Sequence, residues 1–204
     1  SLTDNHLQAE QTVLFDAIFE YEQMMARLPI VVREGQTLTA FHIQTKIFDS
    51  RKYRLTDADG KIYQKWEKYI SDFAYQMYLV QKNWPHLSLK SVLVLPEKTG
   101  QSYTDNLPFL LKPLEKMNVS VPPTNQQLLA KIDVTDLINR FWTNPQFASD
   151  HLPKSSFEET LYYLRDLYLN KKKEVPQVGS KCQNCEFRID KSRIKEGVRS
   201  GFDE

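Results

Sequence analysis

The stretch Phe41-His-Ile-Gln-Thr-Lys-Ile-Phe-Asp-Ser50 decides the fold, together with the stretch Asp72-Phe-Ala-Tyr-Gln-Met-Tyr78 further along the chain. In the first stretch polar and apolar residues alternate, which is typical of a strand with one buried face. Gln44 and Lys46 are two residues apart, so both side chains point to one side of the predicted strand. We therefore expect a strand with a polar end, followed by a helix that carries Gln76 and Tyr78.

Length and composition indicate a globular protein. The chain has 204 residues, of which 41% are hydrophobic and 26% are charged, enough for one domain with a core and an appendage. No apolar run approaches the roughly 18 residues that a membrane span requires, and no secretion signal is visible at the start. Two cysteines three residues apart do not suggest a disulfide framework. We expect a cytoplasmic protein without a membrane partner.

Positive charge gathers near the end of the chain. The net charge is +1, yet residues 165–199 hold ten Lys/Arg and five Asp/Glu, which leaves 17 basic and 21 acidic residues elsewhere. A basic tail of this kind could contact phosphates, with Lys171, Lys172 and Lys173 as candidates. The alternative interpretation is a solvated polar surface.

Periodicity predicts an α/β fold with a central mixed sheet flanked by helices. The expected strands cover residues 12–21, 24–32, 38–47 and 89–95, and the expected helices cover 62–82, 133–142 and 155–168. In the first strand Val13, Phe15, Ala17, Phe19 and Tyr21 are expected to share a face. A capping box is predicted at Ser155 and Glu158. We expect one domain over residues 1–170 and a basic segment over 171–204 that packs on it.

The order of these segments resembles a known enzyme family. It is similar to the nuclease domains of the RecB-like and CRISPR-associated exonuclease branch of the PD-(D/E)XK superfamily, and most of all to an uncharacterised bacterial group within it. The resemblance spans roughly residues 12–188. It rests on short runs in a shared order: Phe15–Phe19, Ala26–Val32, Gln44–Lys46, Asp72–Tyr78, Lys90–Leu95, Asp133–Asp136 and Lys181–Arg188.

The resemblance implies roles for four residues around a metal site. Lys46 corresponds to the catalytic lysine and Gln44 to a metal-binding acid. Pro29 corresponds to the first metal-binding aspartate, and Asp16 to an acid that assists from the side. Hydrolysis of phosphodiesters needs hard oxygen ligands for Mg²⁺ or Mn²⁺. A neutral amide and a proline do not supply them, so we expect a degenerate site and no resident cofactor.

Other residues gain roles from the same resemblance. Gln76 and Tyr78 correspond to a helix motif that positions the site and contacts DNA. Cys182 and Cys185 correspond to part of an iron–sulfur site, which in relatives uses four cysteines. Because this chain has only these two, a complete cluster within it is not expected. A further domain of the same protein is expected beyond the C-terminus.

Three functions follow as hypotheses. The first is a nuclease-like module that binds nucleic acid, or acts as a scaffold in a DNA-processing protein, without efficient cleavage. The second is an active Mg²⁺- or Mn²⁺-dependent DNA exonuclease that uses Asp16, Lys46 and a relocated acid such as Asp49. The third is a protein-interaction module. His42 is interpreted as a packed histidine and not as a metal ligand.

Overall fold

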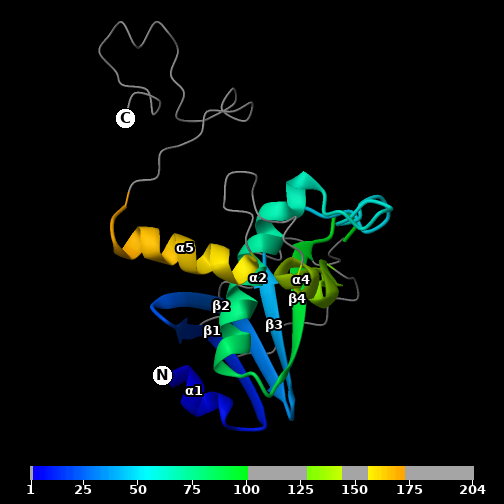
Figure 1. Cartoon of the computed structure of the whole chain (residues 1–204). Coiled ribbons are helices and arrows are strands. Elements are labelled where there is room, and N and C mark those ends of the chain that lie inside the picture. Colours follow the sequence, from blue (N-terminus) through cyan, green and yellow to red (C-terminus); the bar gives the residue numbers. More distant parts are fainter. Residues whose placement is uncertain (1, 101–127, 144–155, 173–204) are drawn as a thin grey trace, which may run out of the picture.

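A computed structural model gives the fold and describes residues 2–100, 128–143 and 156–172. In these residues the chain forms a five-stranded mixed sheet flanked by helices (Figure 1). The predicted α/β class is therefore confirmed. Residues 101–127, 144–155 and 173–204 lie outside the described part. Most of the predicted segment 171–204 does so too.

The sheet has the strand order β1-β2-β3-β4-β5. Its first three strands form an antiparallel meander, and β4 then pairs in parallel with β3, while β5 pairs antiparallel with β4. Glu22 and Gln23 turn the chain between the first two strands with φ angles of 46° and 65°. The strand bounds are β1 Gln11–Tyr21, β2 Met24–Glu34, β3 Thr37–Ile43, β4 Ser88–Pro96 and β5 Leu129–Asp133.

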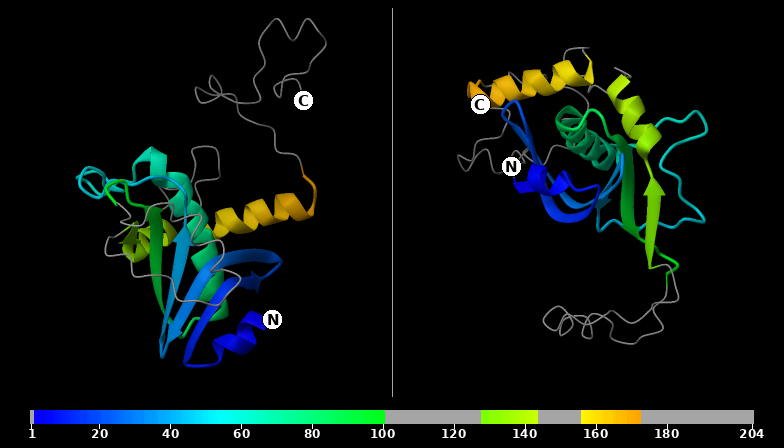
Figure 2. Two further views of the ribbon diagram at one scale, coloured as in Figure 1. Left: turned by 180° about the vertical axis from the view of Figure 1, so that it is seen from behind. Right: turned by 90° about the horizontal axis from the view of Figure 1, so that it is seen from below.

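Helix α2 (Gln64–Asn83) connects β3 to β4 and packs on the sheet. The parallel pairing of β3 with β4 requires such a crossover. Helices α4 (Thr135–Thr143) and α5 (Phe157–Leu169) lie on the same side of the sheet as α2 (Figure 2). The short helix α1 (Leu2–Leu7) precedes β1 and contacts it, with Thr3 Oγ1 accepting a 3.1 Å hydrogen bond from Ile18 N. Neither α1 nor β5 was predicted from the sequence.

The core lies between α2 and the sheet. The helix predicted over residues 62–82 is confirmed, and its apolar residues at helical spacing are all buried: Trp66, Ile70, Phe73, Met77 and Val80. Leu28, Val31, Leu38, Leu93 and Leu95 are fully buried in the same cluster from the strands. Burial of this apolar surface is the main force that holds the helix against the sheet.

The prediction that one face of β1 is apolar throughout was wrong. Phe15 is 72% exposed, whereas Ala17 and Phe19 are buried. The face changes at Asp16, whose φ of 53° lies in the left-handed region, a conformation that aspartate tolerates better than most residues. Pro29 lies opposite Asp16, between the pairs Phe15–Ile30 and Ala17–Leu28, and cannot donate a hydrogen bond to the ladder.

The third strand is shorter than predicted. β3 ends at Ile43 instead of Ile47, and its pairing with β2 ends at Phe41 opposite Ile30. The next residue of β2 is Pro29, which has no N–H to offer to β3. The chain nevertheless stays beside β4, because Gln44 N donates to Val94 O over 3.0 Å and Phe48 N donates to Pro96 O over 2.9 Å.

The capping box of α5 is displaced by one residue from its predicted position. Ser156 accepts from Glu159 N over 3.2 Å, and Glu159 Oε2 accepts from Ser156 N over 3.0 Å. The predicted partner, Glu158, is used elsewhere. Adjacent Ser-Ser and Glu-Glu pairs allow either register, and the interactions of Glu158 with α2 select one. None of the helices in the described ranges is both long and apolar enough to cross a membrane.

Candidate functional site

The candidate site lies where β2 and β3 separate. Gln76, on α2, bridges the two strands: its Nε2 donates to Arg27 O over 3.3 Å, and its Oε1 lies 2.9 Å from His42 Nδ1. His42 Nε2 in turn lies 2.8 Å from Gln44 Nε2. We call the side chains of Gln76, His42 and Gln44 the fork network. Its side-chain hydrogen bonds link β2 and β3 at the place where Pro29 interrupts their backbone hydrogen bonds.

The hydrogen bonds of the fork network fix the protonation of His42. Because Gln76 Nε2 donates to a carbonyl, its Oε1 accepts, so His42 Nδ1 carries the proton and donates. His42 Nε2 then accepts from the Gln44 amide. Burial lowers the pKa of His42, although the hydrogen bond to Gln76 and the charge of Asp72 act in the opposite direction. The ring also stacks on Phe73 with centroids 4.9 Å apart. His42 is thus a neutral packed histidine.

Lys46 points toward the start of α2. Its Nζ donates to Lys65 O over 2.8 Å and lies 4.9 Å from the ring centroid of Trp66 and 5.1 Å from that of Tyr69. Lys46 and Gln44 are both less exposed than their neighbours Thr45 and Ile47, which agrees with the prediction that the two side chains point to one side of the chain. Their functional groups nevertheless have different partners.

Asp16 and Pro29 are brought opposite each other but do not join the fork network. The carboxylate of Asp16 accepts from Arg27 Nε over 3.0 Å and from Arg27 Nη2 over 2.6 Å. Both side chains of this pair are mostly exposed. No hydrogen bond or ion pair joins any two of Asp16, Pro29, Gln44 and Lys46. The side chains of the four residues that the resemblance aligned are therefore not bonded to one another, and their shared role in one site stays a prediction.

The residues at the fork do not suit Mg²⁺ or Mn²⁺. Such ions prefer carboxylate and carbonyl oxygens, whereas the fork network offers imidazole and amide groups that already bond to one another. In the described residues, no three or more His, Cys, Asp or Glu side chains are grouped to hold a metal. Asp49, the proposed relocated acid, is 1% exposed and accepts from Arg51 N over 3.2 Å.

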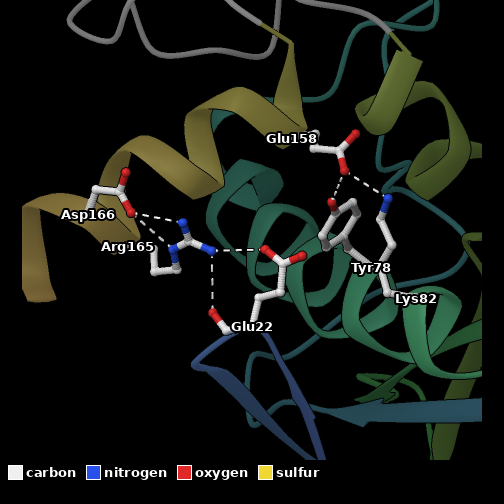
Figure 3. Close-up of polar contacts among 6 residues, drawn as sticks. All are labelled: Glu22, Tyr78, Lys82, Glu158, Arg165 and Asp166. Carbon is white, nitrogen blue, oxygen red and sulfur yellow. Dashed lines mark hydrogen bonds and ion pairs between the residues drawn. The ribbon is translucent and has the colours of Figure 1, made fainter.

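Tyr78 serves as an anchor for α5 in the interior (Figure 3). Its ring is 6% exposed, and its hydroxyl donates to Glu158 Oε1. Lys82 Nζ lies 2.7 Å from the same oxygen. A second link joins Arg165 Nη1 to Glu22 Oε2 over 3.0 Å. The prediction that Tyr78 contacts nucleic acid has no support in this position, because the residue is enclosed.

The anchor of α5 should weaken in acid. Hydrogen bonds from Lys82 and Tyr78 lower the pKa of Glu158 below its ordinary 4.5. A lowered folded-state pKa means that the stabilisation is present above pH 4.5 and is lost as the pH falls through the folded-state pKa. We expect Glu158→Gln to lower the free energy of unfolding by less than about 1 kcal/mol at pH 7, because the ion pair is partly exposed. As the pH falls below 4.5 and through the folded-state pKa, the difference between the variant and the wild type should shrink.

Urea unfolding of the two proteins across this pH range measures the difference. Glu67→Gln is the matched control, because Glu67 is exposed on α2 and has no partner among the described residues. A constant difference between Glu158→Gln and the wild type from pH 7 to pH 3 would contradict the assignment.

The structure describes only some of the remaining predicted site residues. Lys171 and Lys172 are exposed at the end of α5, where their backbone N–H groups bond to Tyr168 O and Leu167 O. Lys173, Cys182 and Cys185 lie outside the described residues. The predictions of a basic tail and of an incomplete cysteine site therefore stay predictions.

Sequence analysis missed a cluster of cations and aromatic rings at the start of α2. We call it the basic–aromatic cluster. Lys65 Nζ lies 4.1 Å from the ring centroid of Tyr53 and 6.0 Å from that of Tyr63. The sequence does contain a signal for this cluster, since residues 51–68 hold six Lys/Arg and only three Asp/Glu. The members of the cluster are Lys46, Tyr53, Tyr63, Lys65, Trp66 and Tyr69.

Fold and site together define an α/β domain in which one helix crosses a mixed sheet and places a neutral polar network at a fork between two strands. Comparisons with protein-family models, with curated proteins and with solved structures find no match for this chain.

Proposed function

We propose that this chain is a nuclease-like module of the PD-(D/E)XK type that contacts nucleic acid without cutting it efficiently. One observation carries the proposal. At the fork, where the resemblance implies metal-binding acids, neutral groups of Gln76, His42 and Gln44 bond to one another. Such a network favours a structural role for the fork over metal-dependent hydrolysis.

The order of elements supports the kinship. A strand that ends in polar residues, a lysine two positions after Gln44, and a helix with Gln76 facing that strand all occur as the resemblance implies. Gln76 contacts both β2 and β3, which agrees with a motif residue that positions the site. The acids that the alternative exonuclease mechanism would use are each paired with an arginine: Asp16 is bonded to Arg27, and Asp49 is bonded to Arg51.

Contact with nucleic acid is supported by cations near the fork. Lys46 lies close to Trp66 and Tyr69, and Lys65 Nζ lies 5.7 Å from the ring centroid of Trp66. Neither forms an ion pair with a carboxylate among the described residues, so both charges are available to phosphates. The net charge of +1 implies modest affinity with a clear dependence on salt.

The test has two arms. Calorimetric titration with Mn²⁺ is expected to show no stoichiometric site, and a nuclease assay with Mn²⁺ should give equal, background rates for the wild type and Lys46→Ala. Cleavage that requires both Mn²⁺ and Lys46 would instead establish the active exonuclease. In the second arm, labelled DNA should bind at low salt and be released by added salt. Absence of binding at low salt would favour the protein-interaction module.

A further inference from the structure

The basic–aromatic cluster is a candidate binding surface that the fork network does not include. Tyr53 and Tyr63 are 42% and 44% exposed, although aromatic residues of this size are usually more enclosed. Lys65 lies within 6.0 Å of both ring centroids. Two accessible rings with an ammonium group close to both suit a ligand that has flat faces and negative charge.

The charge of the surrounding surface has the right sign for such a ligand. Residues 51–68 carry six Lys/Arg and three Asp/Glu, a local net charge of +3, while the whole chain carries +1. Of the three acids, Asp57 is occupied, because its Oδ1 accepts from Asp59 N over 3.0 Å and from Lys61 N over 2.8 Å. Five exposed cations in this segment have no carboxylate partner among the described residues: Lys52, Arg54, Lys61, Lys65 and Lys68.

The loop that presents the two tyrosines is held in place. Tyr53 N donates to Asp49 O over 2.8 Å, and Tyr63 N donates to Leu55 O over 3.0 Å. Leu55 and Ile62 are buried in the core. From α4, Arg140 Nη2 donates to Gly60 O over 2.7 Å. The rings are therefore presented by an ordered scaffold, which reduces the entropy lost on binding.

We propose that Tyr53 and Tyr63 stack on unpaired bases of a single-stranded nucleic acid, while Lys65 and the neighbouring cations contact its phosphates. Exposed aromatic rings combined with positive charge are the usual means of binding single strands, because every base has a face to stack. A duplex hides these faces and offers the rings no partner. This inference rests on the proposed function and names the form of nucleic acid that the module prefers.

The experiment measures fluorescence anisotropy with a labelled oligothymidylate and with a blunt duplex of equal length. We expect the single strand to bind more tightly than the duplex, and Tyr53→Ala and Tyr63→Ala each to weaken single-strand binding about tenfold. Tyr53→Phe should retain affinity, because it preserves the stacking face. Lys65→Gln should lower the slope of log affinity against log salt by about one unit. Tyr168→Ala is the matched control, since Tyr168 is 85% exposed on α5.

The outcomes separate the two proposals. Wild-type affinity in both tyrosine-to-alanine variants, or a preference for the duplex, would overturn the stacking inference while nucleic-acid binding itself stood. Failure of the wild-type protein to bind either oligonucleotide at low salt would overturn both. Because the two tyrosines are exposed, circular dichroism of the variants is expected to match the wild type, so that a loss of affinity reports on the surface.

Discussion

Phe73→Ala is expected to lower the free energy of unfolding by about 3–5 kcal/mol, the cost typical of removing a buried phenylalanine. Phe73 is fully buried on the face of α2 that packs on the sheet, and it stacks on His42. Its removal leaves a cavity at the crossing of helix and sheet and takes away the ring that supports the fork network. Domains of this size have a total stability of about 5–15 kcal/mol, so the variant would be only marginally folded.

Urea unfolding followed by circular dichroism measures this loss. Tyr168→Ala removes a ring of similar size from an exposed position of α5 and should change the free energy of unfolding by less than about 0.5 kcal/mol. Phe73→Leu keeps most of the buried volume and should lose much less than the alanine variant. A loss below about 1 kcal/mol for Phe73→Ala would contradict the placement of this residue in the core.

Gln76→Leu is expected to cost about 1–3 kcal/mol, because leucine cannot hydrogen bond to either strand. Arg27 O would lose a donor and His42 Nδ1–H would lose its acceptor. The penalty arises from polar groups left without partners at a partly buried site, and the volume of the side chain changes little. Gln76 thus stabilises the fork by substituting for the ladder hydrogen bonds that Pro29 prevents.

Gln81→Leu on the same helix provides the comparison. The Gln81 amide makes only a 3.4 Å contact with Pro85 O, so its replacement should cost less than about 0.5 kcal/mol. The difference between the two leucine variants therefore isolates the contribution of the fork network. Equal losses in the two variants would show that Gln76 acts only as a helix-surface residue and would remove the structural basis of the proposed function.

Local patterns along the chain were sufficient to predict most of the helices and strands. The alternation in residues 38–43, the apolar stripe from Trp66 to Val80 and the proline at position 85 each report on short-range geometry, and the corresponding strand and helix are present. The short α1 and β5 were missed, because six residues of helix or five residues of strand give too few repeats for a period to be recognised.

The candidate site was less predictable than the fold. Spacing alone placed Gln44 and Lys46 on one side of the chain, and that holds. It could not show that Lys46 turns to Trp66 and Tyr69 while Gln44 turns to His42. His42 was rightly interpreted as a packed residue, but its role as the centre of a hydrogen-bonded chain depends on Gln76, 34 positions later.

The sequence by itself determined the α/β class, the meander followed by a helix, and the presence of neutral residues at positions 29 and 44, since each follows from residue type or local period. Only the tertiary structure decided where β1 changes its buried face, which partners Asp16, Lys46 and Glu158 choose, and that Lys65 lies close to both Tyr53 and Tyr63. These features depend on contacts between residues far apart in the chain, and a pattern read over one or two turns contains no information about them.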